Sequence, residues 1–198
     1  MKQKKWNHNF AYHQWILHHI KDKNKILDVG CGDGTLATLL ASDNNEVIGL
    51  DIDDKILSIA TRNNQNENIK YLNKDFLEYD FKNQKFDVII FVASIHHMDM
   101  KNALIKAKRI LNKNGIILIV GLAKPSSIID WTVEIIRILP SKIISTFKQI
   151  KTSEDLNINV SYDFPMMTEV RNVCNKELEN YKIRYGLHYR YLLYWIKK

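Results

Sequence analysis

The chain has 198 residues, a length that favours one domain with a small elaboration over two compact domains. Hydrophobic residues make up 45% of the chain and charged residues 26%, which excludes an intrinsically disordered or fibrous protein. The 29 basic and 22 acidic side chains give a net charge of +7. Because the lysines are scattered along the whole chain, this charge by itself does not indicate a nucleic-acid surface.

Cysteine and histidine spacings bear on compartment and metal binding. Cys31 and Cys174 are the only cysteines and lie far apart, so we expect neither a disulfide framework nor a zinc site, and a cytoplasmic location. Polar residues interrupt the basic N-terminus and no apolar stretch reaches 18 residues, so the sequence predicts neither a signal peptide nor a membrane span. No metal site is expected from the N-terminal histidines, which lack helical spacing: His8, His13, His18 and His19.

Short apolar runs alternate with helix-like segments over the first 122 residues. We expect a leading helix, acting as a lid, within residues 1–22, strands at 25–30, 46–51, 69–73, 86–93 and 115–122, and helices at 35–42, 54–64 and 100–112. Strands that are apolar almost throughout are typical of a parallel sheet with helices on both faces. Right-handed crossovers would place the turn after every strand at one edge of that sheet.

The pattern changes after Pro125. Residues 125–165 contain two apolar segments with helical character, near 128–139 and 142–150, and we interpret them as an insertion rather than a second domain. Its predicted role is a substrate cap over the site. A dimer face and a contact with a membrane surface are the alternatives.

The C-terminal part returns to regular structure, with a helix over 168–178 and aromatic-rich strands at 181–187 and 189–196. Two such strands in succession predict an antiparallel hairpin at the edge of the sheet. The expected fold is therefore a single α/β domain over 1–198, Rossmann-like and doubly wound, with a mostly parallel seven-stranded sheet.

A glycine-rich turn follows the first strand in the run ILDVGCGDGT. Gly30, Gly32 and Gly34 leave the main chain free of side chains, so a ligand can lie against it. Thr35 stands where the dinucleotide fingerprint GxGxxG requires its third glycine. No Gly-Lys-Ser/Thr run follows, which excludes a P-loop.

Acidic residues come at the ends of the next two strands. Asp51 ends the strand at 46–51, where a carboxylate can accept both hydroxyls of a ribose. Asp75 follows the third strand, where its carboxylate can accept from the exocyclic amine of adenine while the N–H of Phe76 donates to a ring nitrogen. Together these residues predict an adenine nucleoside as ligand.

Five segments, in their order and spacing, carry a family resemblance: ILDVGCGDG, VIGLDID, NKDFLEYDF, FDVIIFVASIHHM and LNKNGIILIVGL. Over essentially its whole length the chain resembles class I S-adenosylmethionine-dependent methyltransferases, particularly the small bacterial type 11 (UbiE-like) group. The resemblance implies the class I methyltransferase fold, methyl transfer as the activity, and S-adenosyl-L-methionine as the cofactor, with S-adenosyl-L-homocysteine as its product.

The resemblance also implies which residues bind that cofactor. From methionine to adenine they are Tyr12, Asp28, Gly30, Cys31 and Gly32 at the methionine part, Phe91 and Val92 by their backbone at the sulfonium, Asp51 at the ribose, Ile52 on one adenine face, and Asp75 with Phe76 at the adenine edge. Cys31 is interpreted as a small filler between glycines, because no base motif accompanies it as it would a nucleophile.

His96 and His97 follow the fourth strand, beside the position implied for the transferred methyl group. A neutral imidazole can deprotonate a hydroxyl or an amine, and His97 is the predicted base; the alternative is that the pair only shapes the pocket. Aligning two reactants contributes roughly 7 to 11 kcal/mol, against roughly 3 to 5 kcal/mol for a general base, so the reaction does not require one.

The implied function is transfer of a methyl group to a small-molecule acceptor by direct displacement. Two alternatives stay open, an RNA or protein methyltransferase and a non-catalytic protein that binds S-adenosylmethionine. SIHHM stands after the fourth strand instead of the Asp/Asn-Pro-Pro-aromatic box of enzymes that methylate the amino groups of bases and glutamine, which argues against a nucleic-acid partner. A monomer and a homodimer are both compatible with the sequence.

Overall fold

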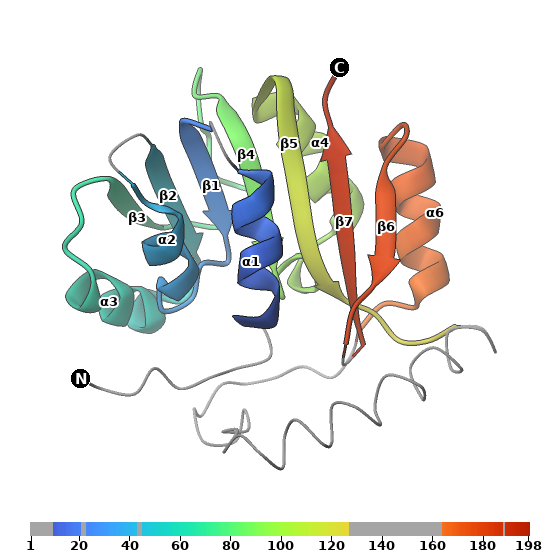
Figure 1. The fold of residues 1–198 in the computed structure, drawn as a ribbon, viewed down its shortest axis with the longest axis horizontal. Helices are drawn as coiled ribbons and strands as arrows, with labels where there is room; N and C mark the ends of the chain where they lie inside the picture. Colours follow the sequence, from blue (N-terminus) through green and yellow to red (C-terminus); the bar gives the residue numbers. More distant parts are fainter. Residues whose placement is uncertain (1–9, 21–22, 43–44, 127–163, 188) are drawn as a thin grey trace, which may run out of the picture.

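A computed structural model describes residues 10–20, 23–42, 45–126, 164–187 and 189–198. Within them one seven-stranded sheet runs in the order β3-β2-β1-β4-β5-β7-β6 (Figure 1). Its strands are β1 Lys25–Val29, β2 Glu46–Asp51, β3 Ile69–Asn73, β4 Phe86–Val92, β5 Leu111–Leu122, β6 Lys182–Tyr185 and β7 Arg190–Ile196. The helices are α1 Phe10–His19, α2 Thr35–Leu40, α3 Asp54–Asn63, the short 3-10 helix η1 Ile95–His97, α4 Met100–Ile110 and α6 Met167–Glu177.

The sheet is parallel from β1 to β5, and β7 is antiparallel to both β5 and β6. The carboxyl ends of the parallel strands therefore share one edge, which is the lower edge in Figure 1. The chain leaves β1 toward β2 and β3 on one side and later returns to β4 and β5 on the other. Ligands of open α/β sheets bind at such a reversal of strand order, so β1 and β4 mark the expected site. The predicted sheet is confirmed.

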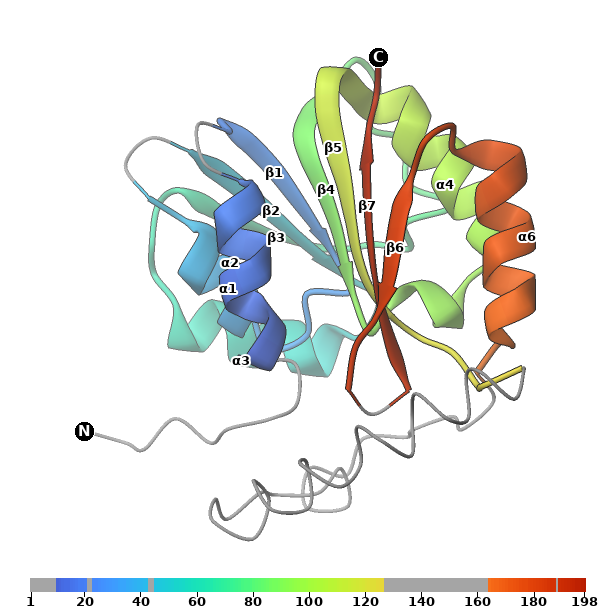
Figure 2. The same ribbon diagram turned by 45° about the vertical axis from the view of Figure 1, so that its right-hand side comes forward.

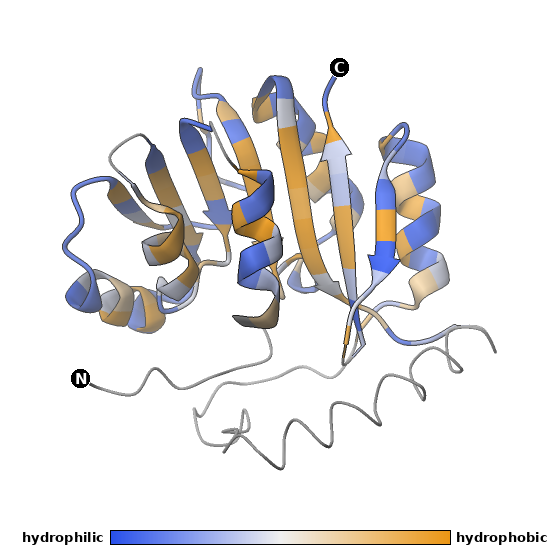
Figure 3. Cartoon of the chain, in the orientation of Figure 1, coloured by the Kyte–Doolittle hydropathy of each residue, from blue (hydrophilic) through white to orange (hydrophobic). Residues whose placement is uncertain are grey.

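Helices cover both faces of the sheet, with α1 and α2 on one face and α4 and α6 on the other (Figures 1 and 2). Along β4, Val88 and Ile90 pack on the α1 side, whereas Ile89 and Phe91 pack on the α4 side, and all four are fully buried. A strand buried on both faces needs an apolar residue at nearly every position. Figure 3 shows this hydrophobic colouring along the central strands β1, β4 and β5.

Two helices begin at aspartates that cap them. The Asp53 carboxylate accepts from the N–H groups of Lys55 and Ile56 over 2.9 and 3.3 Å, at the start of α3. The Asp99 carboxylate accepts from the N–H of Asn102 over 2.8 Å, at the start of α4. Each cap satisfies backbone donors that a first helical turn leaves without a partner.

The boundary between α4 and β5 differs from the prediction. β5 begins at Leu111, four residues before the expected start at Gly115, and α4 ends at Ile110. Asn114 has a φ of 60° and its N–H donates to the carbonyl of Lys197 over 2.8 Å. Asn114 and Gly115 therefore lie within β5, where its pairing with β4 shifts in register.

The C-terminal prediction is confirmed, because α6 is followed by the antiparallel pair β6 and β7. The predicted cap at 125–165 falls almost wholly in 127–163, which lies outside the described residues, so its helices and its role stay predictions. No helix in the described part of the chain is long and apolar enough to cross a membrane. The same residues contain no cluster of three or more His, Cys, Asp or Glu side chains that could hold a metal ion.

Candidate functional site

The glycine-rich turn lies at the carboxyl end of β1, directly beside the end of β4. Gly30 has a φ of 73°, a conformation that favours glycine, and a Cβ at this position would overlap the Cβ of Ser94. The hydroxyl of Ser94 donates to the carbonyl of Val29 over 2.5 Å. The N–H of Gly30 donates to the carbonyl of Leu50 over 2.7 Å. The start of the turn is therefore fixed between β2 and the segment after β4.

Gly32, in the same turn, borders open space. Its φ is 54°, and a Cβ added there would meet no atom within 4 Å. The N–H of Gly32 donates to Oδ2 of Asp51 over 2.8 Å, and Oδ1 of Asp51 accepts from the N–H of Asp53 over 3.0 Å. Each carboxylate oxygen has a second lone pair, so Asp51 can still accept from a ligand. The turn and the acidic side chain thus come together as a nucleoside site requires.

Asp28 is a buried acid in the middle of this arrangement. It lies on β1 with 1% of its surface exposed, and its Oδ2 has no hydrogen-bond partner among the residues described. Burial, followed by the negative charges of Asp51 and Asp33, raises the pKa of Asp28 to about 7. A buried carboxyl group with an oxygen that lacks a partner is suited to a positively charged or hydrogen-bond-donating ligand group.

The turn after β3 is fixed from two sides. Oδ1 of Asp75 accepts from the N–H groups of Leu77 and Glu78 over 2.6 and 3.2 Å, and the carbonyl of Asp75 accepts from the N–H of Tyr79 over 2.9 Å. From α4, Nζ of Lys106 donates to the carbonyls of Leu77 and Tyr79 over 2.8 and 2.6 Å. The backbone that carries the predicted adenine contacts is thereby held in one conformation.

Aromatic side chains of the predicted site belong to the core. Phe76 is 2% exposed, and its ring centroid lies 5.5 Å from that of Phe91, which is fully buried. Nζ of Lys106 lies 5.7 Å from the centroid of Phe76, and burial lowers the pKa of this lysine. Phe76 and Phe91 are thus buried as whole residues, and the backbone contacts with a cofactor that were expected of them stay predictions.

The other predicted cofactor contacts near the turn, Ile52, Val92 and Cys31, differ in exposure. Ile52, the predicted adenine cover, is 71% exposed at the end of β2, and Val92 is half-buried. Cys31 is buried, and this burial raises the pKa of its thiol far above the usual range. A thiol that stays protonated fits a filler of the turn better than a nucleophile.

His96 and His97 form η1 with Ile95, and their ring centroids lie 4.0 Å apart. His97 is exposed, whereas His96 is half-buried with an Nδ1 atom that has no partner in the described structure. Burial, followed by the charges of His97 and Arg190, lowers the pKa of His96 to about 4. His96 is therefore neutral near pH 7, and the role of His97 as base stays a prediction.

Tyr12 links α1 to the turn between β6 and β7. Its hydroxyl donates to the carbonyl of Leu187 over 3.1 Å and accepts from the N–H of Leu187 over 2.6 Å. The predicted contact with the methionine end of a cofactor stays a prediction, and these hydrogen bonds already engage the hydroxyl.

The family model described as "Methyltransferase domain" matches residues 27–119, which run from β1 into β5. The match includes the glycine-rich turn and both acidic strand ends. The chain belongs to the class I S-adenosylmethionine-dependent methyltransferases.

Individual relatives of this methyltransferase domain agree. An uncharacterized methyltransferase of Mycobacterium tuberculosis is 34% identical over 102 residues, which are 51% of this chain and 52% of that protein, so the chain spans about half of its length. A ubiquinone biosynthesis O-methyltransferase of Glaesserella parasuis is 25% identical over 194 residues, covering 89% of this chain and 82% of the relative.

Among solved structures, magnesium protoporphyrin IX methyltransferase from Synechocystis, with S-adenosylhomocysteine bound, superposes with a TM-score of 0.62. The superposition covers 96% of this chain and 81% of that one at 13% identity. At this identity the likeness bears on the fold alone, and it supports the class I methyltransferase fold.

Ser94 and Lys106 shape the site but were not predicted from sequence. Lys106 interrupts the buried stripe of α4 formed by Ala103, Ala107 and Ile110, and a lysine on such a stripe is a signal that could have found it. Ser94 carries no comparable signal, because its contact with Val29 depends on the pairing of β1 with β4.

Proposed function

We propose that this chain binds S-adenosylmethionine and transfers its methyl group to a small-molecule acceptor by direct displacement. The observation that carries the proposal is the position of the family match: residues 27–119 contain the opening at Gly32, the Asp51 carboxylate beside it and the fixed turn at Asp75. The near full-length similarity to an O-methyltransferase of ubiquinone biosynthesis supports a small acceptor.

Each group of residues has its proposed part of the cofactor. Asp51 holds the ribose hydroxyls through its free lone pairs, and the exposed side chain of Ile52 covers one face of adenine. Asp75 and the N–H of Phe76 bind the adenine edge. The methionine part lies along the turn from Gly30 through Cys31 to Gly32, with Asp28 beneath it, and the backbone of Phe91 and Val92 faces the sulfonium.

The chemistry needs little beyond alignment. The acceptor nucleophile attacks the methyl carbon in line with the departing sulfur, and S-adenosylhomocysteine leaves as a neutral thioether. Fixed geometry can supply roughly 7 to 11 kcal/mol of the barrier reduction. The proposed role of His97 is to take the proton that the acceptor loses, which adds roughly 3 to 5 kcal/mol.

Thermal unfolding with S-adenosylmethionine, S-adenosylhomocysteine, NAD and ATP in parallel tests the cofactor. A ligand at about 100 times its Kd stabilises the folded state by roughly 2.7 kcal/mol, so a rise in Tm with the first two ligands only is expected. Asp51→Ala should remove roughly 1.5 to 3 kcal/mol of cofactor binding. Asp54→Ala, in the exposed first turn of α3, is the matched control and should bind normally. A rise with NAD or ATP instead would contradict the proposal.

An acceptor in RNA is the second candidate, suggested by the net charge of +7. Binding of an RNA would weaken steeply with salt, because basic side chains release counterions from the phosphates. Little retention of RNA at any salt concentration is expected here. A steep salt dependence would favour the RNA acceptor over the small molecule.

A further inference from the structure

A second concavity lies at the same edge of the sheet, beyond the end of β4. It has a volume of about 490 Å³ and lies between η1, the start of α4 and the first half of α6. Apolar side chains form most of its wall, among them Ile95, Met98, Met100, Met166 and Val173. This volume and this lining are typical of small-molecule pockets.

Besides His96, three residues with polar side chains line this pocket: Lys124, Glu169 and Tyr191. Glu169 lines it, but its Oε2 already accepts from the N–H of Met166 over 2.7 Å as part of the cap of α6. Lys124 also lines it. The N–H of Lys124 donates to the carbonyl of Pro165 over 2.8 Å, and its carbonyl accepts from the N–H of Met167 over 3.0 Å. The charges of Glu169 and Lys124 are opposite, so they leave no net charge on the wall.

The imidazole of His96 is the distinctive polar group of the wall. Its Nδ1 is buried and makes no hydrogen bond within the described residues, and its ring packs edge-on against Phe164 at 5.2 Å between centroids. A buried polar atom without a partner is a cost to the folded state that a ligand can relieve. Because the pKa of His96 is lowered to about 4, the ring is neutral near pH 7 and offers a hydrogen bond without a charge.

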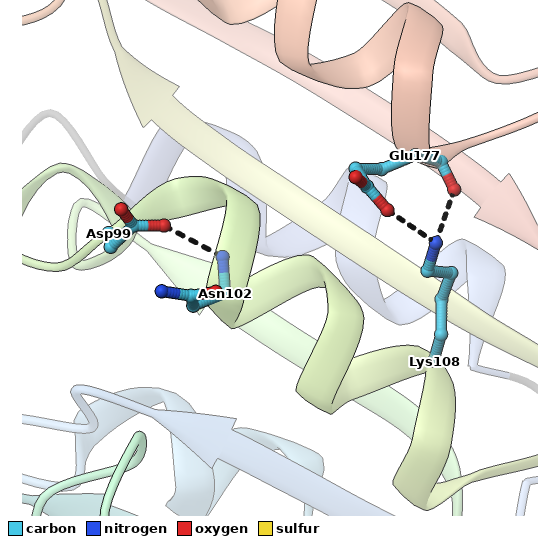
Figure 4. A network of polar contacts seen from close by, with 4 residues as sticks. All are labelled: Asp99, Asn102, Lys108 and Glu177. Carbon is cyan, nitrogen blue, oxygen red and sulfur yellow. Dashed lines mark hydrogen bonds and ion pairs between the residues drawn. The ribbon is translucent and has the colours of Figure 1, made fainter.

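The pocket also lies next to the proposed methyl donor. Its wall begins at Ile95, one residue after Ser94, the residue that touches Gly30 and holds the end of β1. The contacts drawn in Figure 4 hold α4 and α6, the two helices that border the pocket, together. Nζ of Lys108 on α4 donates to Oε2 and to the carbonyl of Glu177 on α6, over 2.8 and 2.7 Å, and Asp99 caps α4.

We propose that this pocket binds the methyl acceptor, and that the acceptor is an uncharged, mainly apolar molecule whose hydroxyl group makes a hydrogen bond with the imidazole of His96. The proposal rests on the proposed function and names the substrate class for it. An ionised acceptor would lose its hydration among methionines and aliphatic side chains, beside a wall that carries no net charge to replace it.

Three probes of one shape test this class: 2-naphthol, naphthalene and 2-naphthoate. Their binding is measured by calorimetry on the full chain saturated with S-adenosylhomocysteine. We expect 2-naphthol to bind about fivefold more tightly than naphthalene, the worth of one hydrogen bond, and 2-naphthoate to bind least. His96→Phe should bring 2-naphthol to the affinity of naphthalene and leave S-adenosylhomocysteine binding unchanged.

Two further variants address the pocket itself. Met166→Trp and Val173→Trp place an indole in the cavity from a half-exposed and a half-buried position, and should abolish binding of both 2-naphthol and naphthalene. Ile105→Trp, 42% exposed on α4 and not part of the lining, is the matched control and should bind the probes normally. Retained cofactor binding shows that each variant is folded.

The outcomes separate the two proposals. Tightest binding of 2-naphthoate would overturn the uncharged class, and equal binding of 2-naphthol and naphthalene would overturn the role of His96. No probe binding by a chain that binds S-adenosylhomocysteine would overturn the pocket. Probe binding by a chain that does not bind S-adenosylhomocysteine would instead overturn the proposed function, and with it the identity of the occupant as a methyl acceptor.

Discussion

The ends of β1 to β3 and the pocket beside η1 share one edge of the sheet but are built from different parts of the chain. At β1 to β3 the functional groups are backbone N–H groups and carboxylates on short turns, such as Gly32 with Asp51. Around η1 they are side chains, several of which α6 and β7 bring from far along the sequence. The first region fits a ligand with many polar groups, and the second fits an apolar one. Under the two proposals above, the first region binds the cofactor and the second binds the methyl acceptor.

The largest expected effect distinguishes two glycines of one turn, Gly30 as necessary for the fold and Gly32 as necessary for ligand binding. Gly30→Val should destabilise the chain by about 4 kcal/mol or more, because its side chain would overlap Ser94 at a left-handed φ. Gly32→Val should cost about 1 to 2 kcal/mol of stability, for its left-handed φ alone, yet abolish cofactor binding. Urea unfolding and calorimetry measure the two quantities. Equal destabilisation by both variants would contradict the assignment of the open space at Gly32 to the ligand.

Asp28 predicts how stability depends on pH. Its folded pKa of about 7 lies above the ordinary 3.8, so its contribution to stability is fully present below pH 3.8 and is lost as the pH rises through 7. About three pKa units correspond to about 4 kcal/mol. Asp28→Asn should therefore raise stability at pH 8 by up to this amount and leave it unchanged near pH 4. Urea unfolding across this range measures it.

The pKa of His96, in the apolar region, is shifted in the opposite direction to that of Asp28 in the polar region. Its folded pKa of about 4 lies below the ordinary 6.5, so its contribution is present above pH 6.5 and is lost as the pH falls through 4. Relative to the unsubstituted chain, the unfolding free energy of Asp28→Asn should consequently rise with pH between 4 and 7, while that of His96→Phe should fall. The same slope in both variants would rule out opposite pKa shifts.

The smallest expected effect concerns Lys106. This residue lies on α4, the helix that borders the apolar pocket, yet it holds the turn at Asp75 in the polar region. Lys106→Met leaves the carbonyls of Leu77 and Tyr79 without their donor and should cost about 2 kcal/mol of stability. It should also weaken cofactor binding several-fold, since the turn at Asp75 loses one of its two supports. Lys108→Met, which loses the bonds to Glu177 on α6, is the control. It should lower stability but not cofactor affinity, and equal losses of affinity would contradict a specific role for Lys106.

Local patterns predicted much of the fold. β2 and β3 have the predicted bounds, because runs such as EVIGLD alternate cleanly with polar turns. The start of β5 was missed, since Leu111 joins the strand through pairing with Phe86 and not through any local signal. The acidic ends of β2 and β3 were predictable for a similar reason, as their place in the chain fixes their place at the edge of the sheet.

The sequence by itself determined the family, the doubly wound sheet and the residues that follow β1, β2 and β3, because each depends on neighbours in the chain. Only the tertiary structure decided that Gly30 faces Ser94 while Gly32 faces open space, since their φ angles and sequence context are alike. It also decided that His96 lines a pocket while its neighbour His97 is exposed. Such differences depend on which distant segments pack nearby, and packing between distant segments leaves no periodic signal in the sequence.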